Sequence, residues 1–98
     1  MIMTGKQRRH LRAIAHSIKP LVNLGKRGLS NETKGEIKSQ LYDHELIKLK
    51  ILETCPLSKK ECARELSSDN EIEVVQVIGK TLVLYSQNPE ESKIKFPT

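Results

Sequence analysis

The sequence contains very few aromatic residues. Tyr42, Tyr85 and Phe96 are the only ones, and there is no tryptophan. Proteins that read single-stranded nucleic acid on a sheet surface, such as RRM and OB-fold domains, stack bases on several exposed aromatic side chains. The composition therefore argues against both classes. Tyr85 ends an apolar segment and is expected to pack in the core or at a sheet edge.

Cysteine and long apolar segments are also scarce. Cys55 and Cys62 are too few for a disulfide framework, and Cys62 falls in a predicted helix, so we expect both to be reduced packing residues. No stretch approaches the roughly 20 apolar residues of a transmembrane helix. The basic run of residues 6–12 is not followed by the apolar segment of a secretory signal. We therefore expect a cytoplasmic protein that does not associate with a membrane.

Known catalytic and cofactor-binding motifs are incomplete. Residues 79–81 (GKT) resemble the end of a phosphate-binding loop but lack its earlier glycine, and residues 25–28 lack the three-glycine spacing of a dinucleotide site. The segment that begins at His44 resembles a zinc-protease helix, yet Lys48 stands where the second histidine is required. We therefore predict that the protein is not an enzyme and uses no cofactor, metal or small-molecule substrate.

Positive charge is abundant and unevenly distributed. The chain has 98 residues and a net charge of +5, but residues 1–34 alone carry +7, so the remaining 64 residues sum to −2. An evenly solvated surface would not concentrate charge in this way. The asymmetry indicates a polyanionic partner at the N-terminal third. A basic face kept only for solubility is the alternative interpretation.

The hydrophobic pattern predicts seven elements in the order αβαβαββ. The helices are expected over residues 4–19, 30–43 and 58–66, and the strands over 21–24, 47–51, 74–78 and 81–85. Strands separated by helices imply parallel pairing with right-handed crossovers, and the final hairpin adds an antiparallel pair. We expect one α/β domain over residues 1–98, with a core over about 3–86 and a frayed or loosely docked tail over 87–98.

The first predicted helix is basic along one flank. Arg8, Arg12 and Lys19 follow one another there at about 100° per residue, with Arg9 turned further from the core. Positive charge in the first turns, which begin with Lys6, opposes the helix dipole and is destabilising by about 0.3–1 kcal/mol per residue. An external anion would explain why the sequence keeps cations there.

The second basic feature is the segment Gly25-Lys26-Arg27-Gly28, called here the GxxG loop. It lies between a predicted strand and the N-terminus of a predicted helix, whose free N–H groups attract phosphate. Its glycines would let a nucleic-acid backbone approach the main chain, as in the GxxG loop of KH domains. An ordinary tight turn is the alternative interpretation. With so few aromatics, the partner would be held by its backbone and shape, which suits structured RNA.

Several motifs of the chain resemble those of a known family and occur in its order. They are Gly5-Lys6-Gln7, Leu11-Arg12-Ala13 with His16, Lys19-Pro20-Leu21-Val22, Gly25-Lys26-Arg27-Gly28-Leu29, His44-Glu45-Leu46-Ile47-Lys48, Val77-Ile78-Gly79-Lys80 and Val83-Leu84-Tyr85. Over residues 3–86 the chain resembles the bacterial YhbY proteins and the CRM (chloroplast RNA splicing and ribosome maturation) domain. Two positions depart from the pattern: Ser86 stands where arginine is expected, and Gly35 interrupts the second helix.

The resemblance implies both a fold and a function. The fold is a four-stranded mixed sheet with three helices, similar to the C-terminal domain of translation initiation factor three. The function is ribosome assembly, through binding of large-subunit ribosomal RNA or its precursor particle by the GxxG loop and the adjoining basic surface. Separately, we expect the protein to be a monomer. A module that docks an acidic protein partner and a small RNA-modifying enzyme are the alternatives. The predicted RNA-binding residues are Lys6, Arg8, Arg9, Arg12, Lys19, Gly25, Lys26, Arg27 and Gly28.

Overall fold

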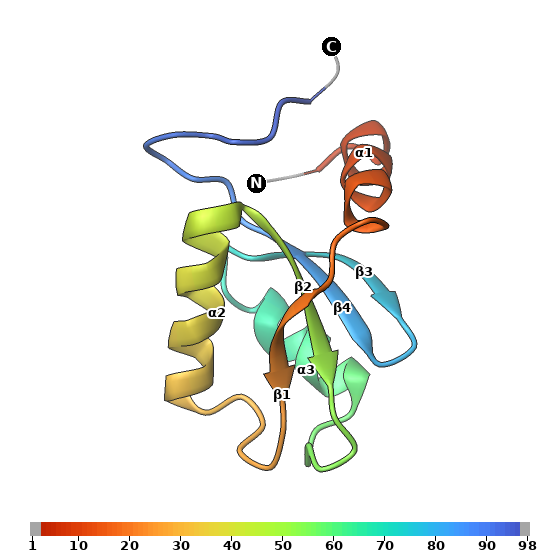
Figure 1. Cartoon of the computed structure of the whole chain (residues 1–98), viewed down its shortest axis with the longest axis vertical. Helices are drawn as coiled ribbons and strands as arrows, with labels where there is room; N and C mark the ends of the chain where they lie inside the picture. The colour runs from red at the N-terminus through yellow and green to blue at the C-terminus, as the bar shows by residue number, and fades with distance from the viewer. Residues whose placement is uncertain (1–2, 97–98) are drawn as a thin grey trace.

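Seven elements follow one another in the predicted order in the computed structural model, which describes residues 3–96 (Figure 1). They are α1 (Gly5–Ala15), β1 (Pro20–Leu24), α2 (Asn31–His44), β2 (Leu46–Ile51), α3 (Lys59–Ser67), β3 (Glu73–Ile78) and β4 (Thr81–Tyr85).

A polar cap begins each of the three helices. At α1, the Gln7 N–H donates to Thr4 Oγ1 while the Thr4 N–H donates to the Gln7 side chain. Ser58 and Glu61 form the same reciprocal capping box at α3, and Ser30 caps α2. These caps satisfy N–H groups that have no partner inside the helix. The predicted helix starts are therefore confirmed.

The first helix is shorter than its apolar stripe predicts. Its last α-helical hydrogen bond joins the N–H of His16 to the carbonyl of Arg12, after which the chain tightens into a turn. Pro20 disfavours the helical conformation in the residue before it. Lys19 therefore lies outside α1, and the prediction that it continues the basic flank of the helix is wrong.

The sheet has the strand order β1-β2-β4-β3. β1 and β2 pair in parallel, as predicted, but β4 lies between β2 and β3 and is antiparallel to both. The prediction of parallel pairing across the second crossover is therefore wrong, because β3 does not touch β2. Residues 82–85 are buried on both faces, which suits a central strand, whereas Val77 and Ile78 at the end of β3 are exposed, which suits an edge.

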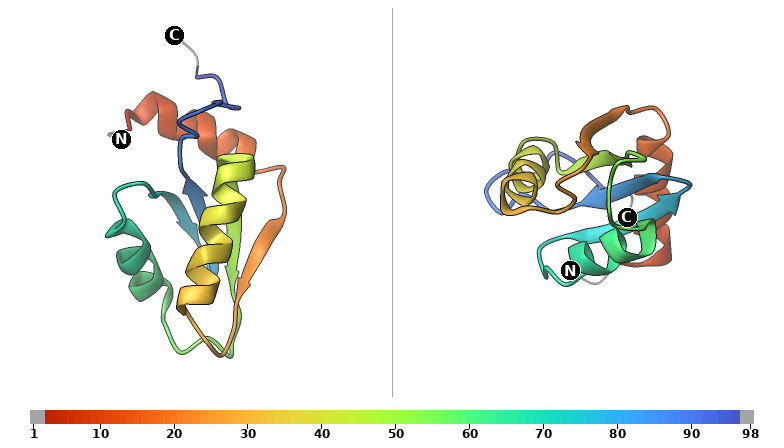
Figure 2. Two further views of the ribbon diagram at one scale, coloured as in Figure 1. Left: turned by 90° about the vertical axis from the view of Figure 1, so that its left-hand side faces the viewer. Right: turned by 90° about the horizontal axis from the view of Figure 1, so that it is seen from below.

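The helices lie on both faces of the sheet. Figure 2 shows α1 on one side of the sheet and α2 on the other. The larger core cluster lies on the face covered by α2 and α3 and consists of Val22, Leu24, Leu29, Ile37, Leu41, Ile47, Leu49, Ile51, Cys62, Leu66, Ile72, Leu82 and Leu84. The smaller cluster lies under α1 and consists of Leu11, Ala15, Leu46, Val75, Val83 and Tyr85.

The face that carries α1 is divided into a covered half and an open half. α1 packs over the first residues of β2 and the last residues of β4, where the smaller cluster lies. Further along, the register aligns Asn23, Lys50, Thr81 and Ile78 across the four strands. These four residues define the open half, and among the described residues no helix covers them.

The segment after β4 is docked on the domain. The buried carboxylate of Glu45 accepts hydrogen bonds from the backbone N–H groups of Asn88 (2.7 Å), Lys93 and Ile94 (2.8 Å). Ile94 and Phe96 also pack against the smaller cluster. Residues 87–96 thus form no helix or strand but contact the domain at several points, so they are docked and not frayed; residues 97–98 lie outside the described chain.

Candidate nucleic-acid interface

The GxxG loop is a tight turn at the end of β1. The Gly28 N–H donates to the Gly25 carbonyl at 3.0 Å, and Gly28 has a φ of +54°, which strains any residue with a side chain. An added Cβ at Gly28 would also lie 3.5 Å from the Pro56 ring. The segment that leads into α3 therefore lies against the loop at Gly28, while Lys26 and Arg27 are exposed.

The two central cations of the loop are available to a ligand. Within the described chain Lys26 has no hydrogen bond or ion pair. Arg27 pairs with Glu32 at 3.0 Å, but their side chains are 77% and 83% exposed. An ion pair this exposed contributes little to stability, so Arg27 can exchange Glu32 for an external phosphate at small cost. The loop also leads into the N-terminus of α2, which favours anions.

The other predicted cations lie far from this loop. Figure 1 shows α1 at the top of the molecule and the segment between β1 and α2 at the bottom, so the length of the sheet separates them. Arg9 and Arg12 are exposed on α1, and Lys6 is exposed in its first turn. Lys19 is exposed in the turn before β1. The predicted interface is thus divided between the two ends of the domain.

Arg8 is held by contacts within the protein. Its guanidinium donates to the carbonyls of Val74 and Val75 at 3.0 and 2.8 Å and to Glu73 at 2.9 Å. The register of β3 shifts between Val74 and Gln76, so these carbonyls lie at a bulge, where the pairing of the strand is interrupted. Arg8 therefore joins α1 to the irregular part of β3.

A groove lies between α1 and the open half of the sheet. Its lining consists of Arg9, Arg12, Ala13, Ala15, His16, Lys48, Gln76 and Ile78. Three of these side chains are cationic, and this lining contains no carboxylate. Lys48 and Gln76 were not among the predicted site residues. The alternation of Lys48 and Lys50 with apolar residues indicates a polar sheet face that includes Lys48, but it does not indicate a binding site. No sequence pattern points to Gln76.

Lys48 and Lys50 connect the groove to the GxxG loop. Residues two apart in a strand point to the same face, so both lysines lie on the face that carries α1. Lys50 is aligned with Asn23, and the GxxG loop begins two residues after Asn23. We call the set that runs from the groove across the open half to the loop the basic strip; it consists of Arg9, Arg12, His16, Lys48, Lys50, Lys26 and Arg27.

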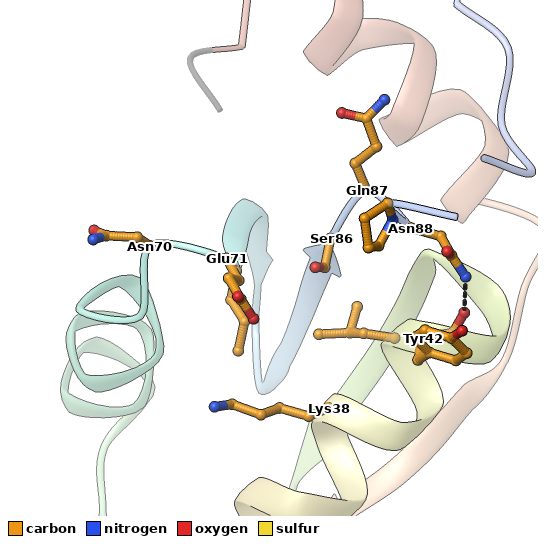
Figure 3. A pocket seen from close by; sticks show the side chains of 10 residues that line it. Lys38, Tyr42, Asn70, Glu71, Ser86, Gln87 and Asn88 are labelled. Carbon is orange, nitrogen blue, oxygen red and sulfur yellow. Dashed lines mark hydrogen bonds between the residues drawn. The ribbon is translucent and has the colours of Figure 1, made fainter. Parts of the chain in front are cut away.

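A separate pocket lies between α2 and the chain around residues 70–72 and 86–89 (Figure 3). The Tyr42 hydroxyl donates to Glu90 at 2.9 Å, and this carboxylate raises the pKa of Tyr42. Lys38 in the lining is ion-paired with Asp69 at 3.1 Å. With Glu71 also in its lining, this pocket is poorly suited to a polyanion.

The described residues offer little for catalysis. Residues 3–96 contain no group of three or more His, Cys, Asp or Glu side chains that could hold a metal ion. Cys55 and Cys62 are free, as predicted. Burial, and the nearby Cys55, raise the pKa of Cys62 to about 11, so its thiol is a poor nucleophile at neutral pH. Within this part of the chain, no helix is long and apolar enough to span a bilayer.

The fold and its basic strip define a small α/β domain suited to a polyanion. Residues 3–86 match the family model of the CRS1 / YhbY (CRM) domain. The chain is 36% identical over 96 residues to the probable RNA-binding protein YqeI of Bacillus subtilis, covering 98% of this chain and 100% of that one. It belongs to the CRS1 / YhbY (CRM) domain family, as the motifs predict.

Further relatives agree with this assignment. An RNA-binding protein of Haemophilus influenzae is 36% identical over 95 residues, covering 97% of this chain and 95% of that one. The solution structure of SAV1595 from Staphylococcus aureus matches with a TM-score of 0.78 at 40% identity, covering 98% of this chain and all of that one. The predicted architecture of three helices and a four-stranded mixed sheet is therefore confirmed.

Proposed function

We propose that this protein binds RNA through the GxxG loop and the adjoining basic surface, and that it acts in assembly of the large ribosomal subunit. Its RNA would be large-subunit ribosomal RNA or the precursor particle. The observation that carries the proposal is the pair of exposed cations, Lys26 and Arg27, on a glycine-flanked turn at the N-terminus of α2. The curated relatives named above are themselves called RNA-binding proteins.

The mode of binding would be recognition of backbone and shape. Tyr85 is 1% exposed, so its ring offers no open stacking surface, and the half-buried Phe96 already contacts the rings of Tyr85 and His10 at 5.8 and 5.7 Å between centroids. Tyr42 is half-exposed, but it lies on α2, on the opposite side of the sheet from α1. The cations that remain accessible reach phosphates, which carry little sequence information.

No catalytic step is part of this proposal. A small RNA-modifying enzyme would need a nucleophile or base beside its RNA, and Cys62 is buried with its pKa raised. Binding alone would allow the protein to protect or to fold a segment of precursor RNA.

The first test replaces the two loop cations with acids. Lys26→Glu combined with Arg27→Glu is expected to leave folding intact, because both side chains are exposed, and to weaken binding to labelled ribosomal RNA severely. Arg64→Glu combined with Lys95→Glu is the matched control, with the same change of charge at exposed positions outside the basic strip. Unchanged affinity of the loop variant would remove the loop from the site.

The salt dependence of the wild-type protein belongs to the same test. If about five phosphates are contacted, log K against log salt is expected to slope near about −3.5 for single-stranded RNA. A flat dependence would count against binding to a nucleic-acid backbone.

The second test separates RNA from a protein partner. Tagged protein is purified from cells with and without ribonuclease treatment of the lysate. Co-purification with large-subunit precursor particles that is lost on RNA digestion supports the proposal. Association that survives digestion would favour the docking of an acidic protein partner instead. Crosslinking in cells, followed by sequencing of the attached RNA, would then identify the bound segment.

A further inference from the structure

The groove between α1 and the sheet is assembled from parts of the chain that are distant in sequence. Arg9, Arg12 and His16 come from α1 and its C-terminal cap, Lys48 comes from β2 and Gln76 from β3. The fold therefore places several positive side chains together, although they repel one another. Such a cluster opposes folding unless an external anion neutralises it.

The cations of the groove are not used by the fold. Within residues 3–96, the side chains of Arg9, Arg12 and Lys48 make no hydrogen bond or ion pair. Arg8 provides the contrast, because its three hydrogen bonds to β3 account for its position. A structural role thus explains Arg8 but leaves its neighbour Arg9 unexplained. The side-chain N–H groups of the groove cations are therefore available to a ligand.

The path from the groove to the GxxG loop is a single line of cations. Lys48 and Lys50 are two residues apart, and the loop lies two residues beyond the level of Lys50. At about 3.3 Å per residue, the path from Lys48 to the loop is roughly 13 Å. A KH-type GxxG loop clamps about four nucleotides. An RNA strand that ran from the loop past Lys50 and Lys48 would therefore reach the groove within a few nucleotides.

The open half of the sheet offers suitable contacts between these two ends. Asn23 and Thr81 have polar groups that could meet ribose hydroxyls, and Ile78 is 52% exposed. The single line formed by Lys48 and Lys50 suits the phosphate backbone of one RNA strand, whereas a duplex would present two backbones.

We propose that the groove between α1 and the sheet is a second phosphate-backbone site, and that one RNA strand crosses the open half of the sheet between the groove and the GxxG loop. This inference rests on the proposed RNA binding and extends it to Lys48 and Gln76, which sequence patterns did not identify. The RNA strand is held at both ends of the sheet. The distance between the two sites along the sheet therefore sets the length of RNA that is bound.

The test removes two groove cations that lie on different elements. Arg12→Ala combined with Lys48→Ala is titrated with single-stranded polyuridylate over a range of salt concentrations. Each lost phosphate contact makes the slope shallower by about 0.7, so a change of about 1.4 is expected, with about 25-fold weaker binding near 0.1 M salt. Arg64→Ala combined with Lys95→Ala is the control and is expected to keep the wild-type slope.

A second variant, which adds a charge to the groove, tests the site even if the double alanine variant fails to fold. Gln76→Lys adds a cation to the same groove, so it is expected to steepen the slope by about 0.7. In nuclear magnetic resonance titrations of the wild type, the amide signals of Arg12, His16 and Lys48 should shift together with those of residues 25–28.

Two outcomes separate this inference from the function on which it rests. If the groove variant and Gln76→Lys both keep the wild-type slope while Lys26→Ala with Arg27→Ala weakens binding, the groove site is wrong and RNA binding through the loop stands. If the wild type shows no salt-dependent binding to polyuridylate or to ribosomal RNA, the proposed function fails and the groove site with it.

Discussion

Arg8 and Arg9 are neighbours with the same charge and different roles. Arg8 reaches into the protein and joins α1 to β3, whereas Arg9 lines the groove. The sequence predicts that both belong to a basic helix, with Arg9 turned further from the core. It does not predict that Arg8 is held within the protein, because the carbonyls that hold it lie at a bulge more than 60 residues further along the chain. Which cation remains available is decided by tertiary contacts.

Tyr85 is buried as the sequence predicts, but its hydroxyl is poorly accommodated. Among the described residues its oxygen has no hydrogen-bond partner, and burial, with the nearby Glu45 carboxylate, raises the pKa of Tyr85. A buried polar group without a partner costs about 1–3 kcal/mol. Tyr85→Phe is therefore expected to leave stability unchanged or to raise it by about 1 kcal/mol, measured by urea unfolding. A clear loss of stability would show that the hydroxyl has a partner.

At the scale of elements, short sequence patterns predict where individual helices and strands begin. The capping residues Thr4, Ser30 and Ser58 mark the three helix starts, and alternation marks β2. The strand order is not local: β4 enters the centre of the sheet because all of residues 82–85 can be buried. A short apolar run fits a buried position in either kind of sheet, so the sequence does not reveal this insertion.

Gly35 offers a test of α2. The helix runs through it without interruption, although the sequence suggests a weak point, and an added Cβ there would meet no atom within 4 Å. Because glycine is about 0.8–1 kcal/mol less favourable than alanine inside a helix, Gly35→Ala is expected to stabilise the protein by about that amount. Thermal unfolding measures the change. A decrease in melting temperature would show that another part of the protein depends on the glycine.

At the scale of the whole molecule, the candidate interface is larger than the sequence suggests. Charge asymmetry points to the N-terminal third, where Arg9, Arg12 and the GxxG loop occur. However, α1 and the loop lie at opposite ends of the sheet, and Lys48 and Lys50 of the middle third lie between them. The sequence does not predict this connection, because it depends on the register of β1 against β2 and on the face of the sheet where α1 packs.

The docked tail is another feature of the whole molecule. Glu45 is fully buried with a φ of +63°, and its carboxylate accepts N–H groups from residues 88, 93 and 94. Burial by itself raises the pKa of Glu45, but these hydrogen bonds together bring it below its ordinary value of 4.5. The tail has no periodic pattern, so the sequence offers no sign that it docks.

Acid is therefore expected to release the tail. Because the pKa of Glu45 is lower in the folded state, its carboxylate stabilises the protein above pH 4.5, and this contribution is lost as the pH falls further through the folded-state value. Amide exchange at Ile94 measured against pH follows the release. Glu45→Gln is expected to cost about 2 kcal/mol and to abolish this acid transition. An unchanged Ile94 amide in Glu45→Gln would mean that packing alone holds the tail.

Both ends of the described chain are anchored at one pole of the molecule. Met3 packs against the same small cluster as Ile94 and Phe96, beneath α1. A biotin or dye joined beyond either end would therefore sit beside α1, with the sheet between it and the GxxG loop. Protein immobilised through a terminal tag would present its loop to the solution and hold α1 next to the support. Surface-based affinities would then underrepresent contacts at the α1 end of the basic strip relative to measurements on freely tumbling protein.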